Sequence, residues 1–160
     1  YRNIILVLFR IGVDILMENY TQEIQLVVFK LDGEEYGIDI LQVKEIIRLL
    51  DITRVPKAPW FIEGVISLRG TVIPVIDLRK RFQLTASNRD EDCRIIVVMV
   101  DDITFGIIVD SVNEVLRLNK NDIEPSPTVA GSTNGAYIKG IGKLNDRLIT
   151  LLELDKLIEH

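Results

Sequence analysis

Two kinds of segment each occur twice and in the same order along the sequence, and this duplication restricts the possible folds more than any other feature. Residues 64–78 align without a gap with residues 140–154, and residues 32–46 align in the same way with residues 101–115. All four segments are rich in β-branched and apolar residues, which favour strands. Repetition of an ordered pair of segments indicates two similar structural units. The chain is therefore predicted to form two similar β-rich halves.

The first long segment has the pattern of a tight β-hairpin. Two apolar runs, Gly64–Leu68 and Thr71–Leu78, flank Arg69-Gly70, and this glycine readily adopts the positive φ angle that a two-residue turn requires. Pro74 lacks the N–H group of a sheet ladder, so we expect it on an edge or at a bulge. Arg69 is consequently predicted at the exposed tip of the hairpin, where its charge is available to a partner.

The other apolar runs also have the length and composition of short strands. Asp32-Gly33 is a hairpin signal between two of them, and Asp101-Asp102 takes the corresponding place in the second half. The further strands predicted are Gln25–Leu31, Glu35–Ile40, Arg94–Val100, Ile103–Val109, Tyr137–Ile141 and Arg147–Glu153.

Helices are predicted to be few and short. Apolar spacing within Leu41–Leu50 indicates one amphipathic helix, and Leu154–Glu159 is expected to form a terminal helix. Residues 59–62 could form a single helical turn. The segment Pro125–Gly135 is predicted to be a loop from its composition.

Many short strands with only short helices indicate an all-β barrel or sandwich. Together with the duplication, this predicts one domain, residues 17–160, made of two packed β-barrels at about residues 23–84 and 93–160. The polar segment Thr85–Asp92 is the candidate linker between them.

The first sixteen residues, 1–16, are expected to be an extension outside the fold. Their apolar run is broken by Arg10 and Asp14, and it is shorter than the ~20 residues of a transmembrane helix. No small-residue cleavage site of a signal peptide follows. Met17 precedes a polar segment and has the appearance of a natural start.

Composition and charge exclude several classes of protein. The net charge of −5 gives no field that attracts nucleic acid. Cys93 is the single cysteine, which excludes an internal disulfide and a Cys-based zinc site, and a buried thiol is expected there. A hydrophobic content of 48% with 27% charged residues is typical of a soluble globular protein, for which the cytosol is the simplest compartment.

Residues with the pattern of a catalytic site are lacking. The single histidine, His160, is the last residue, and the sequence contains neither a Walker-type phosphate loop nor a nucleophile elbow. The acidic pairs Glu34-Glu35 and Asp101-Asp102 fall in predicted turns, where solvated side chains are the usual outcome. We therefore expect a non-catalytic binding module that uses no cofactor and no metal.

A resemblance to a known family rests on four segments, which are Glu34–Ile40, Val43–Ile46, Gly64–Arg79 and Gly106–Val112. In these segments the chain resembles CheW, the coupling protein of bacterial and archaeal chemotaxis. The likeness extends from about Gln25 to Ile158, and the block 64–79 is its most specific part. Ser67 departs from the asparagine that often precedes Leu-Arg-Gly in the family, which affects the local hydrogen bonding of the hairpin.

This resemblance implies both a fold and a function. The fold would be two intertwined five-stranded barrels of the SH3-like type, in agreement with the duplication. The function would be that of a cytoplasmic adaptor that couples chemoreceptors to the histidine kinase CheA at arrays on the inner face of the membrane. Its partners would be the regulatory domain of the kinase and the cytoplasmic tip of the receptors, without nucleic acid and without insertion into the membrane.

The resemblance also implies partner-binding roles for eight residues, which are Ile40, Val43, Glu45, Gly64, Leu68, Arg69, Val109 and Val112. Glu45 and Arg69 fit such a role because charged groups are rarely buried without a partner. Ile40, Val109 and Val112 would line the groove between the barrels that binds receptors in the family. From the sequence alone, these three are equally suitable as core residues, and for Val43 the two roles have even odds.

The duplication is asymmetric at this site, because Glu114 matches Glu45 whereas Asn145 stands where Arg69 would be. Two alternative identities remain open. One is a fragment of CheA's own regulatory domain, which shares the barrels. The other is an unrelated small β-barrel enzyme or ligand-binding protein, which a deep pocket with convergent polar groups would support.

Overall fold

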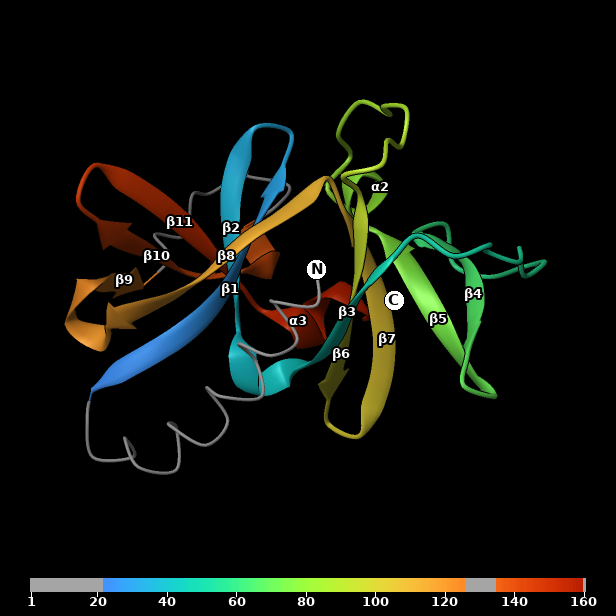
Figure 1. The fold of residues 1–160 in the computed structure, drawn as a ribbon, viewed down its shortest axis with the longest axis horizontal. Coiled ribbons are helices and arrows are strands. Elements are labelled where there is room, and N and C mark those ends of the chain that lie inside the picture. Colours follow the sequence, from blue (N-terminus) through green and yellow to red (C-terminus); the bar gives the residue numbers. More distant parts are fainter. Residues whose placement is uncertain (1–21, 126–134, 160) are drawn as a thin grey trace.

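The computed structural model describes residues 22–125 and 135–159 (Figure 1). The predictions for residues 1–16, for His160 and for most of the loop Pro125–Gly135 lie outside these described residues. The elements in chain order are β1 (Glu23–Leu31), β2 (Glu34–Asp39), η1 (Ile40–Gln42), β3 (Val43–Arg48), β4 (Ile62–Leu68), β5 (Thr71–Asp77), α2 (Leu78–Arg81), β6 (Arg94–Val100), β7 (Ile103–Val109), β8 (Ser111–Asn119), η2 (Lys120–Asp122), β9 (Ile123–Pro125), η3 (Gly135–Tyr137), β10 (Ile138–Leu144), β11 (Arg147–Leu152) and α3 (Leu154–Leu157).

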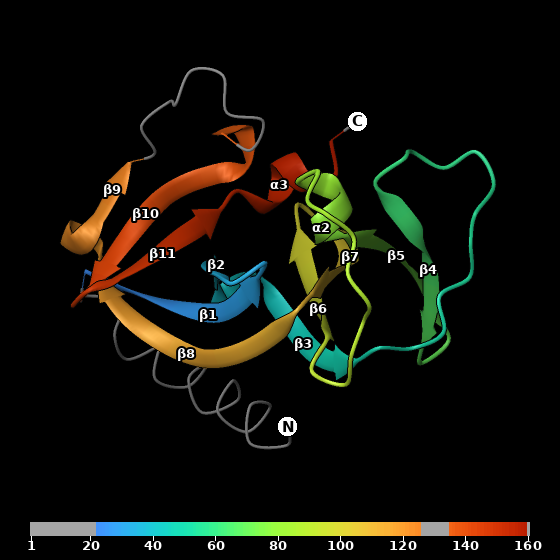
Figure 2. The same cartoon turned by 90° about the horizontal axis from the view of Figure 1, so that it is seen from above.

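The strands form two sheets, which lie side by side in Figures 1 and 2. One sheet has five strands in the order β3-β6-β7-β5-β4, and the other has six in the order β8-β1-β2-β11-β10-β9. The all-β prediction with short helices is confirmed. The sixth strand of the second sheet is the three-residue β9, which pairs with β10.

Each sheet takes strands from both halves of the sequence. The chain leaves the six-stranded sheet after β2, builds the whole five-stranded sheet from β3 to β7, and returns with β8. Residues 23–84 and 93–160 are therefore halves of the sequence and do not correspond to the two sheets. The parallel pairs β5–β7 and β2–β11 join the halves within each sheet.

The predicted hairpins are confirmed, with turns at Asp32-Gly33, Arg69-Gly70 and Asp101-Asp102. Pro74 lies in β5 just before Val75–Asp77, the residues that pair with β7, so its missing N–H falls outside that pairing. No strand was predicted for β8, although part of it lies in the repeat 101–115.

The prediction of a helix at Leu41–Leu50 is wrong. The segment forms the short η1 and then β3, which pairs with β6. A β-bulge at Lys44, between Val43 and Glu45, shifts the alternation of the strand, so that Val43 and Ile46 face one core cluster and Ile47 another. A bulge in a strand thus produced an apolar spacing that resembles a helix. The helical turn predicted at 59–62 occurs only as a single hydrogen-bonded turn, in which Ile62 N donates to Pro59 O at 3.0 Å, and Ile62 begins β4.

Three apolar clusters form the core. The largest lies between the sheets and contains residues of β1, β5, β6, β7, α2 and α3, among them Phe29 and Phe105, together with Phe61 from the connection before β4. A second cluster, around Ile66, Ile73 and Ile95, belongs to the five-stranded sheet, and a third, around Leu26, Leu118 and Ile149, belongs to the six-stranded sheet. Strands such as β1 and β7 are buried on both faces because each face contacts a different cluster.

Candidate partner-binding surface

The tip of the β4–β5 hairpin presents an arginine that is ion-paired yet open to solvent. Arg69 Nη1 and Nη2 donate to the two carboxylate oxygens of Glu45, at 2.5 and 3.0 Å. The Arg69 side chain is 73% exposed and that of Glu45 is 19% exposed. Hydrogen bonding to Glu45 raises the pKa of the Arg69 guanidinium. The exposed tip predicted from the sequence is present, and its partner within the chain is Glu45.

This ion pair connects opposite edges of the five-stranded sheet, because β3 and β4 are its edge strands. Glu45 lies opposite Val97 in the ladder with β6, and Val97 belongs to the same apolar cluster against which Leu68 packs. Because paired residues of adjacent strands point to the same face, Glu45 and Leu68 lie on the same side of the curled sheet. The structure therefore brings Glu45, Leu68 and Arg69 together.

The backbone of the turn holds Arg69 in an unfavourable conformation. Arg69 has φ 51° and Gly70 has φ 79°, and a left-handed conformation carries a steric cost for a residue with a Cβ. Asn145, the matching turn residue of the second half, has φ 55°, and asparagine tolerates this conformation better than arginine does. Arginine at this tip is thus not explained by the preference of the turn.

Gly64 is buried and supports the hairpin from behind. A Cβ atom at this position would lie 2.3 Å from the carbonyl oxygen of Thr53 and 2.7 Å from Ile52 Cγ2. The absence of a side chain allows a two-way backbone bridge, in which Thr53 N donates to Val65 O at 2.9 Å and Val65 N donates to Thr53 O at 2.8 Å. Gly64 therefore positions its neighbours and offers no side chain to a partner.

The three residues expected at the groove between the barrels, Ile40, Val109 and Val112, and the further partner-binding residue Val43 differ in their burial. Ile40 and Val109 are buried, at 7% and 1% exposure, within the central cluster between the sheets. Val43 and Val112 are partly buried and pack against the same cluster. Ile40 and Val109 are therefore core residues in this structure, and only Val43 and Val112 retain exposed surface.

Sequence reasoning missed an exposed apolar residue beside the tip. Val72 lies on β5 between the tip and the buried Ile73, and it is largely exposed. Its counterpart in the second half, Leu148, is also largely exposed. The alternation of the strand was the available signal, because Ile73 and Val75 face inward and Val72 must then face outward.

The second half also contains an ion-pair cluster, which sequence reasoning missed as well. Arg147, the first residue of β11, donates to Glu35 on β2 at 2.7 and 3.1 Å and to Glu114 on β8 at 2.5 Å. These hydrogen bonds raise the pKa of Arg147, and the bond from Arg147 lowers the pKa of Glu35. Arg147 is far less exposed than Arg69.

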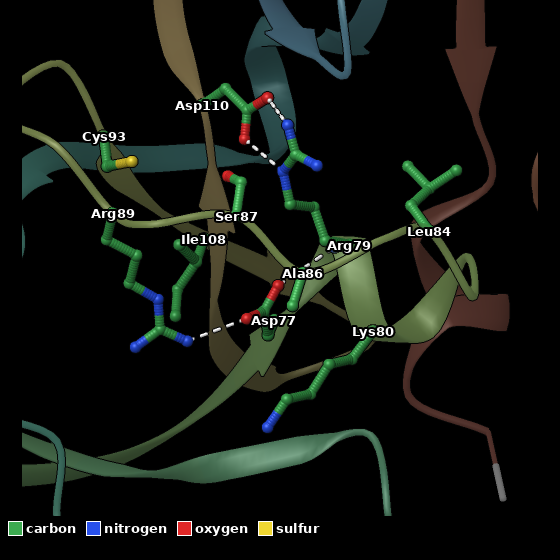
Figure 3. A pocket seen from close by; sticks show the side chains of 10 residues that line it. All are labelled: Asp77, Arg79, Lys80, Leu84, Ala86, Ser87, Arg89, Cys93, Ile108 and Asp110. Atoms are coloured by element: carbon green, nitrogen blue, oxygen red, sulfur yellow. Dashed lines mark hydrogen bonds and ion pairs between the residues drawn. The ribbon is translucent and has the colours of Figure 1, made fainter.

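A cavity of about 230 Å³ lies beside α2, under the segment 84–93 (Figure 3). Arg79 points to Asp110 on one side and donates to it at 2.9 and 2.6 Å, while Arg89 donates to Asp77 at 2.7 Å. Lys80 and Arg89 both pair with Glu63. The cations that line the cavity are thus already neutralised by carboxylates. Cys93, also at the cavity, is buried as predicted, and burial raises the pKa of its thiol.

Asp110 also joins the two sheets. It accepts hydrogen bonds from the Asp32 backbone N–H at 2.8 Å and from Arg79, and Arg79 lies 3.5 Å from the Asp32 carboxylate. Burial alone would raise the pKa of Asp110, but the hydrogen bonds from Arg79 and from Asp32 N–H outweigh it and lower the pKa. The contact ties the β1–β2 turn of one sheet to α2, which follows β5 of the other.

Two further kinds of site were sought within the part of the chain that the structure describes. Across residues 22–125 and 135–159, no group of three or more His, Cys, Asp or Glu side chains is arranged to hold a metal ion. Among those same residues, no helix has the length and apolar character to cross a membrane.

Comparison with known proteins identifies the family. Residues 25–160 match the CheW-like domain. The chemotaxis protein CheW of Klebsiella aerogenes is 40% identical over 84% of this chain and 81% of its own length, and the chemotaxis protein CheW of Helicobacter pylori is 38% identical over 89% and 86%. The crystal structure of the scaffolding protein TtCheW from Thermoanaerobacter tengcongensis superposes with a TM-score of 0.80 at 43% identity, covering 86% of this chain and 88% of that one. The chain belongs to the CheW family.

Proposed function

We propose that this chain is a chemotaxis adaptor that couples chemoreceptors to the histidine kinase CheA through non-catalytic protein–protein binding. Its partners are the regulatory domain of the kinase and the cytoplasmic tip of the receptors, and it acts in the cytoplasm at their arrays. The relatives named above are CheW proteins and not kinases, which favours the adaptor over a fragment of CheA. The CheW-like domain covers most of the chain.

The observation that carries this proposal is the exposed ion pair of Arg69 and Glu45. Arg69 is held outward at a turn that disfavours it, and its guanidinium is presented with a fixed orientation by two hydrogen bonds to Glu45. Arginine is enriched at the centres of protein interfaces, and a preoriented side chain loses little entropy on binding. Val72, Leu68 and the partly exposed Val43 and Val112 supply apolar surface for the same two partners.

Calorimetric titration tests this function with a matched pair of variants. The wild type is expected to bind both the purified CheA regulatory domain and a receptor cytoplasmic fragment. Arg69→Ala should weaken binding to the kinase domain about 30-fold, as removal of an interface arginine commonly does. Asn145→Ala alters the equivalent turn of the second half and should weaken binding less than about threefold.

Two results would contradict the proposal. A wild-type chain that binds neither partner is not an adaptor of this kind. If Arg69→Ala folds, as judged by circular dichroism, and binds both partners as the wild type does, the hairpin tip is not the working surface.

A further inference from the structure

The short helix α2 ends in three consecutive basic residues, and each of them contacts a different part of the molecule. Arg79 pairs with Asp110 at the start of β8, and Lys80 pairs with Glu63 on β4. Arg81 is the only one of the three that is buried, with 8% exposure. A run of basic residues usually forms a solvated face, so the burial of its last member requires an explanation.

The charge of Arg81 is buried without a carboxylate beside it. Across residues 22–125 and 135–159, its hydrogen bonds are donated by Nη2 to the carbonyl oxygens of Glu159 at 2.6 Å and Lys156 at 3.3 Å. Within the same ranges, its buried Nε has no acceptor. Because burial of an unpaired ion costs free energy, the filling of space alone does not explain an arginine at this position.

Three aromatic rings surround the guanidinium of Arg81. Its central carbon lies 3.9 Å from the ring centroid of Phe61, 5.0 Å from that of Tyr137 and 5.6 Å from that of Trp60. A cation within about 6 Å of a ring centroid is attracted to the ring. Trp60 and Phe61 precede β4 of the five-stranded sheet, whereas Tyr137 precedes β10 of the six-stranded sheet. Arg81 therefore contacts segments that lead into both sheets.

A row of aromatic rings continues from this cluster into the six-stranded sheet. Tyr137 stacks on Phe82, with 5.6 Å between the ring centroids. Phe82 contacts Tyr36 of β2 at 5.7 Å, and Tyr36 stacks on Phe29 of β1 at 5.7 Å. Such pairs prefer defined ring orientations. Arg81 thus lies where a row of rings that starts in β1 meets the connection before β4.

The same arginine also holds the C-terminal helix α3. Leu154 and Leu157 of this helix are buried in the cluster between the sheets. Glu153 N, directly before the helix, donates to Tyr137 O at 2.7 Å. In Figure 2, α2 and α3 both lie at the junction of the two sheets, and the bonds from Arg81 to the last carbonyls of the α3 segment connect them.

We propose that Arg81 is a positioning residue that fixes the six-stranded sheet relative to the five-stranded sheet. The surface that depends on this placement carries Val43 of β3 and Val112 of β8, because these residues come from different sheets and pack against the same cluster. The hairpin tip does not depend on it, since Arg69 and its partner Glu45 both belong to the five-stranded sheet. The consequence for partner binding rests on the proposed function.

Spin labels on the two sheets measure their relative placement. Labels are attached at Ser67→Cys on β4 and Lys143→Cys on β10, two exposed positions, in a Cys93→Ala background. Methionine fills the space of Arg81 without leaving an unpaired charge, so Arg81→Met should fold. Double electron–electron resonance should show a distance distribution at least about twice as wide as in the wild type. Arg48→Met, at an exposed position of β3, is the matched control and should leave the width unchanged.

An unchanged distance distribution in Arg81→Met, with folding verified by circular dichroism, would overturn the proposal. If Arg81→Met does not fold, Arg81→Lys replaces it, because lysine keeps the charge but lacks the planar group that stacks on the rings. Arg81→Lys should widen the distribution at least about 1.5-fold. A width equal to that of the wild type would overturn the proposal here as well.

Calorimetric titration tests the consequence for binding. Arg81→Met should weaken binding of the receptor fragment, which the CheW resemblance places between the barrels, at least about fivefold, because only molecules with the native placement of the sheets bind with full affinity. Binding of the kinase regulatory domain should weaken less than about twofold, because the tip at Arg69 stays intact.

The outcomes separate this inference from the proposed function. If Arg81→Met widens the distance distribution and still binds the receptor fragment as the wild type does, the claim that the surface between the sheets depends on Arg81 is wrong. If the wild type binds neither partner, the proposed function fails, and the spin-label distances still decide whether Arg81 fixes the two sheets.

Discussion

Glu45 and Glu114 occupy equivalent positions in the duplicated sequence, yet their charges are neutralised in different ways. Each follows a β-bulge, at Lys44 in β3 and at Asn113 in β8, and each lies opposite a valine of a core cluster. Glu45 is paired with Arg69 at a hairpin tip, whereas Glu114 shares Arg147 with Glu35. The two halves thus share the bulged strand that carries the glutamate, but the arginine that pairs with this glutamate comes from a different position in each half.

The difference indicates two roles for one geometry. Arg147 lies at the start of a strand and contacts two carboxylates from two other strands, so it connects β11, β2 and β8. Arg69 has one partner and protrudes into solvent at a strained turn. We infer that the cluster of the second half serves stability and that the tip of the first half serves binding.

A matching pair of glycines shows where the two halves remained alike. Gly64 approaches the Thr53 carbonyl, and its counterpart Gly140 approaches the carbonyl of Glu124 in β9, where an added Cβ would lie 2.7 Å from the oxygen. In both halves, the missing side chain of this glycine lets a preceding segment pair through its backbone with the first strand of the hairpin, Thr53 with Val65 of β4 and β9 with β10. The shared need for close backbone contact explains why this residue type occurs at both positions.

The largest effect is expected from these glycines. Gly64→Ala should lower the free energy of unfolding by about 3 kcal/mol and Gly140→Ala by about 2 kcal/mol, because the added methyl group collides with a backbone carbonyl, more closely at Gly64. Urea denaturation measures both. Equal stability of Gly64→Ala and the wild type would show that Thr53 moves away without cost, and that the bridge does not position the hairpin.

Next in size is the removal of Arg147. Arg147→Ala should lower the free energy of unfolding by about 1 kcal/mol, since it leaves Glu35 and Glu114 without a cation in a partly solvated site. Arg69→Ala should leave the denaturation midpoint nearly unchanged because Arg69 is highly exposed. In the binding assay we expect the opposite order, with Arg69→Ala weakening partner binding more than Arg147→Ala does. Equal losses of stability in the two variants would contradict the division of roles.

Acid titration sharpens the same comparison. The hydrogen bonds from Arg147 lower the pKa of Glu35, so this carboxylate contributes stability above the unfolded glutamate pKa of about 4.3, and the contribution is lost as pH falls through the folded pKa. The stability difference between the wild type and Arg147→Ala should therefore shrink below about pH 4. Asp110 and Glu63 also have lowered pKa values, but they are present in both proteins and cancel. A difference that persists unchanged to pH 2.5 would exclude the Glu35 contribution.

The smallest effect is expected from transplanting the tip. Asn145→Arg should change the free energy of unfolding by no more than about 0.5 kcal/mol, and it should not improve binding of the kinase domain, because Glu114 already has Arg147 as its partner. Thermal denaturation and calorimetric titration check the two parts. A gain in affinity would show that an arginine at either tip suffices for binding.

The sequence was sufficient to predict which residue of the candidate site lies at an exposed tip. It was not sufficient to predict which side chains that residue contacts. The Arg-Gly dipeptide between two apolar runs was enough to place Arg69 at a tip, because turn geometry is a local property. Its partner Glu45 is 24 positions away, and Arg147 is 112 positions from Glu35. Ile40 and Val109 were equally suitable for groove and core, and their burial depends on how the two sheets pack.

The sequence by itself determined most of the strands, the hairpins and the duplication, but not β3 and β8, since alternation, turn residues and repeats act over short stretches of chain. The segment Leu41–Leu50 was wrongly predicted to be a helix because a single bulged residue, Lys44, interrupts the alternation of inward and outward side chains by which a strand is recognised. Tertiary structure alone decided which sheet each strand joins and which charges meet. The reason is physical: edge strands such as β3 and β4 come together only when the whole sheet curls, and this depends on side chains packed from all parts of the chain.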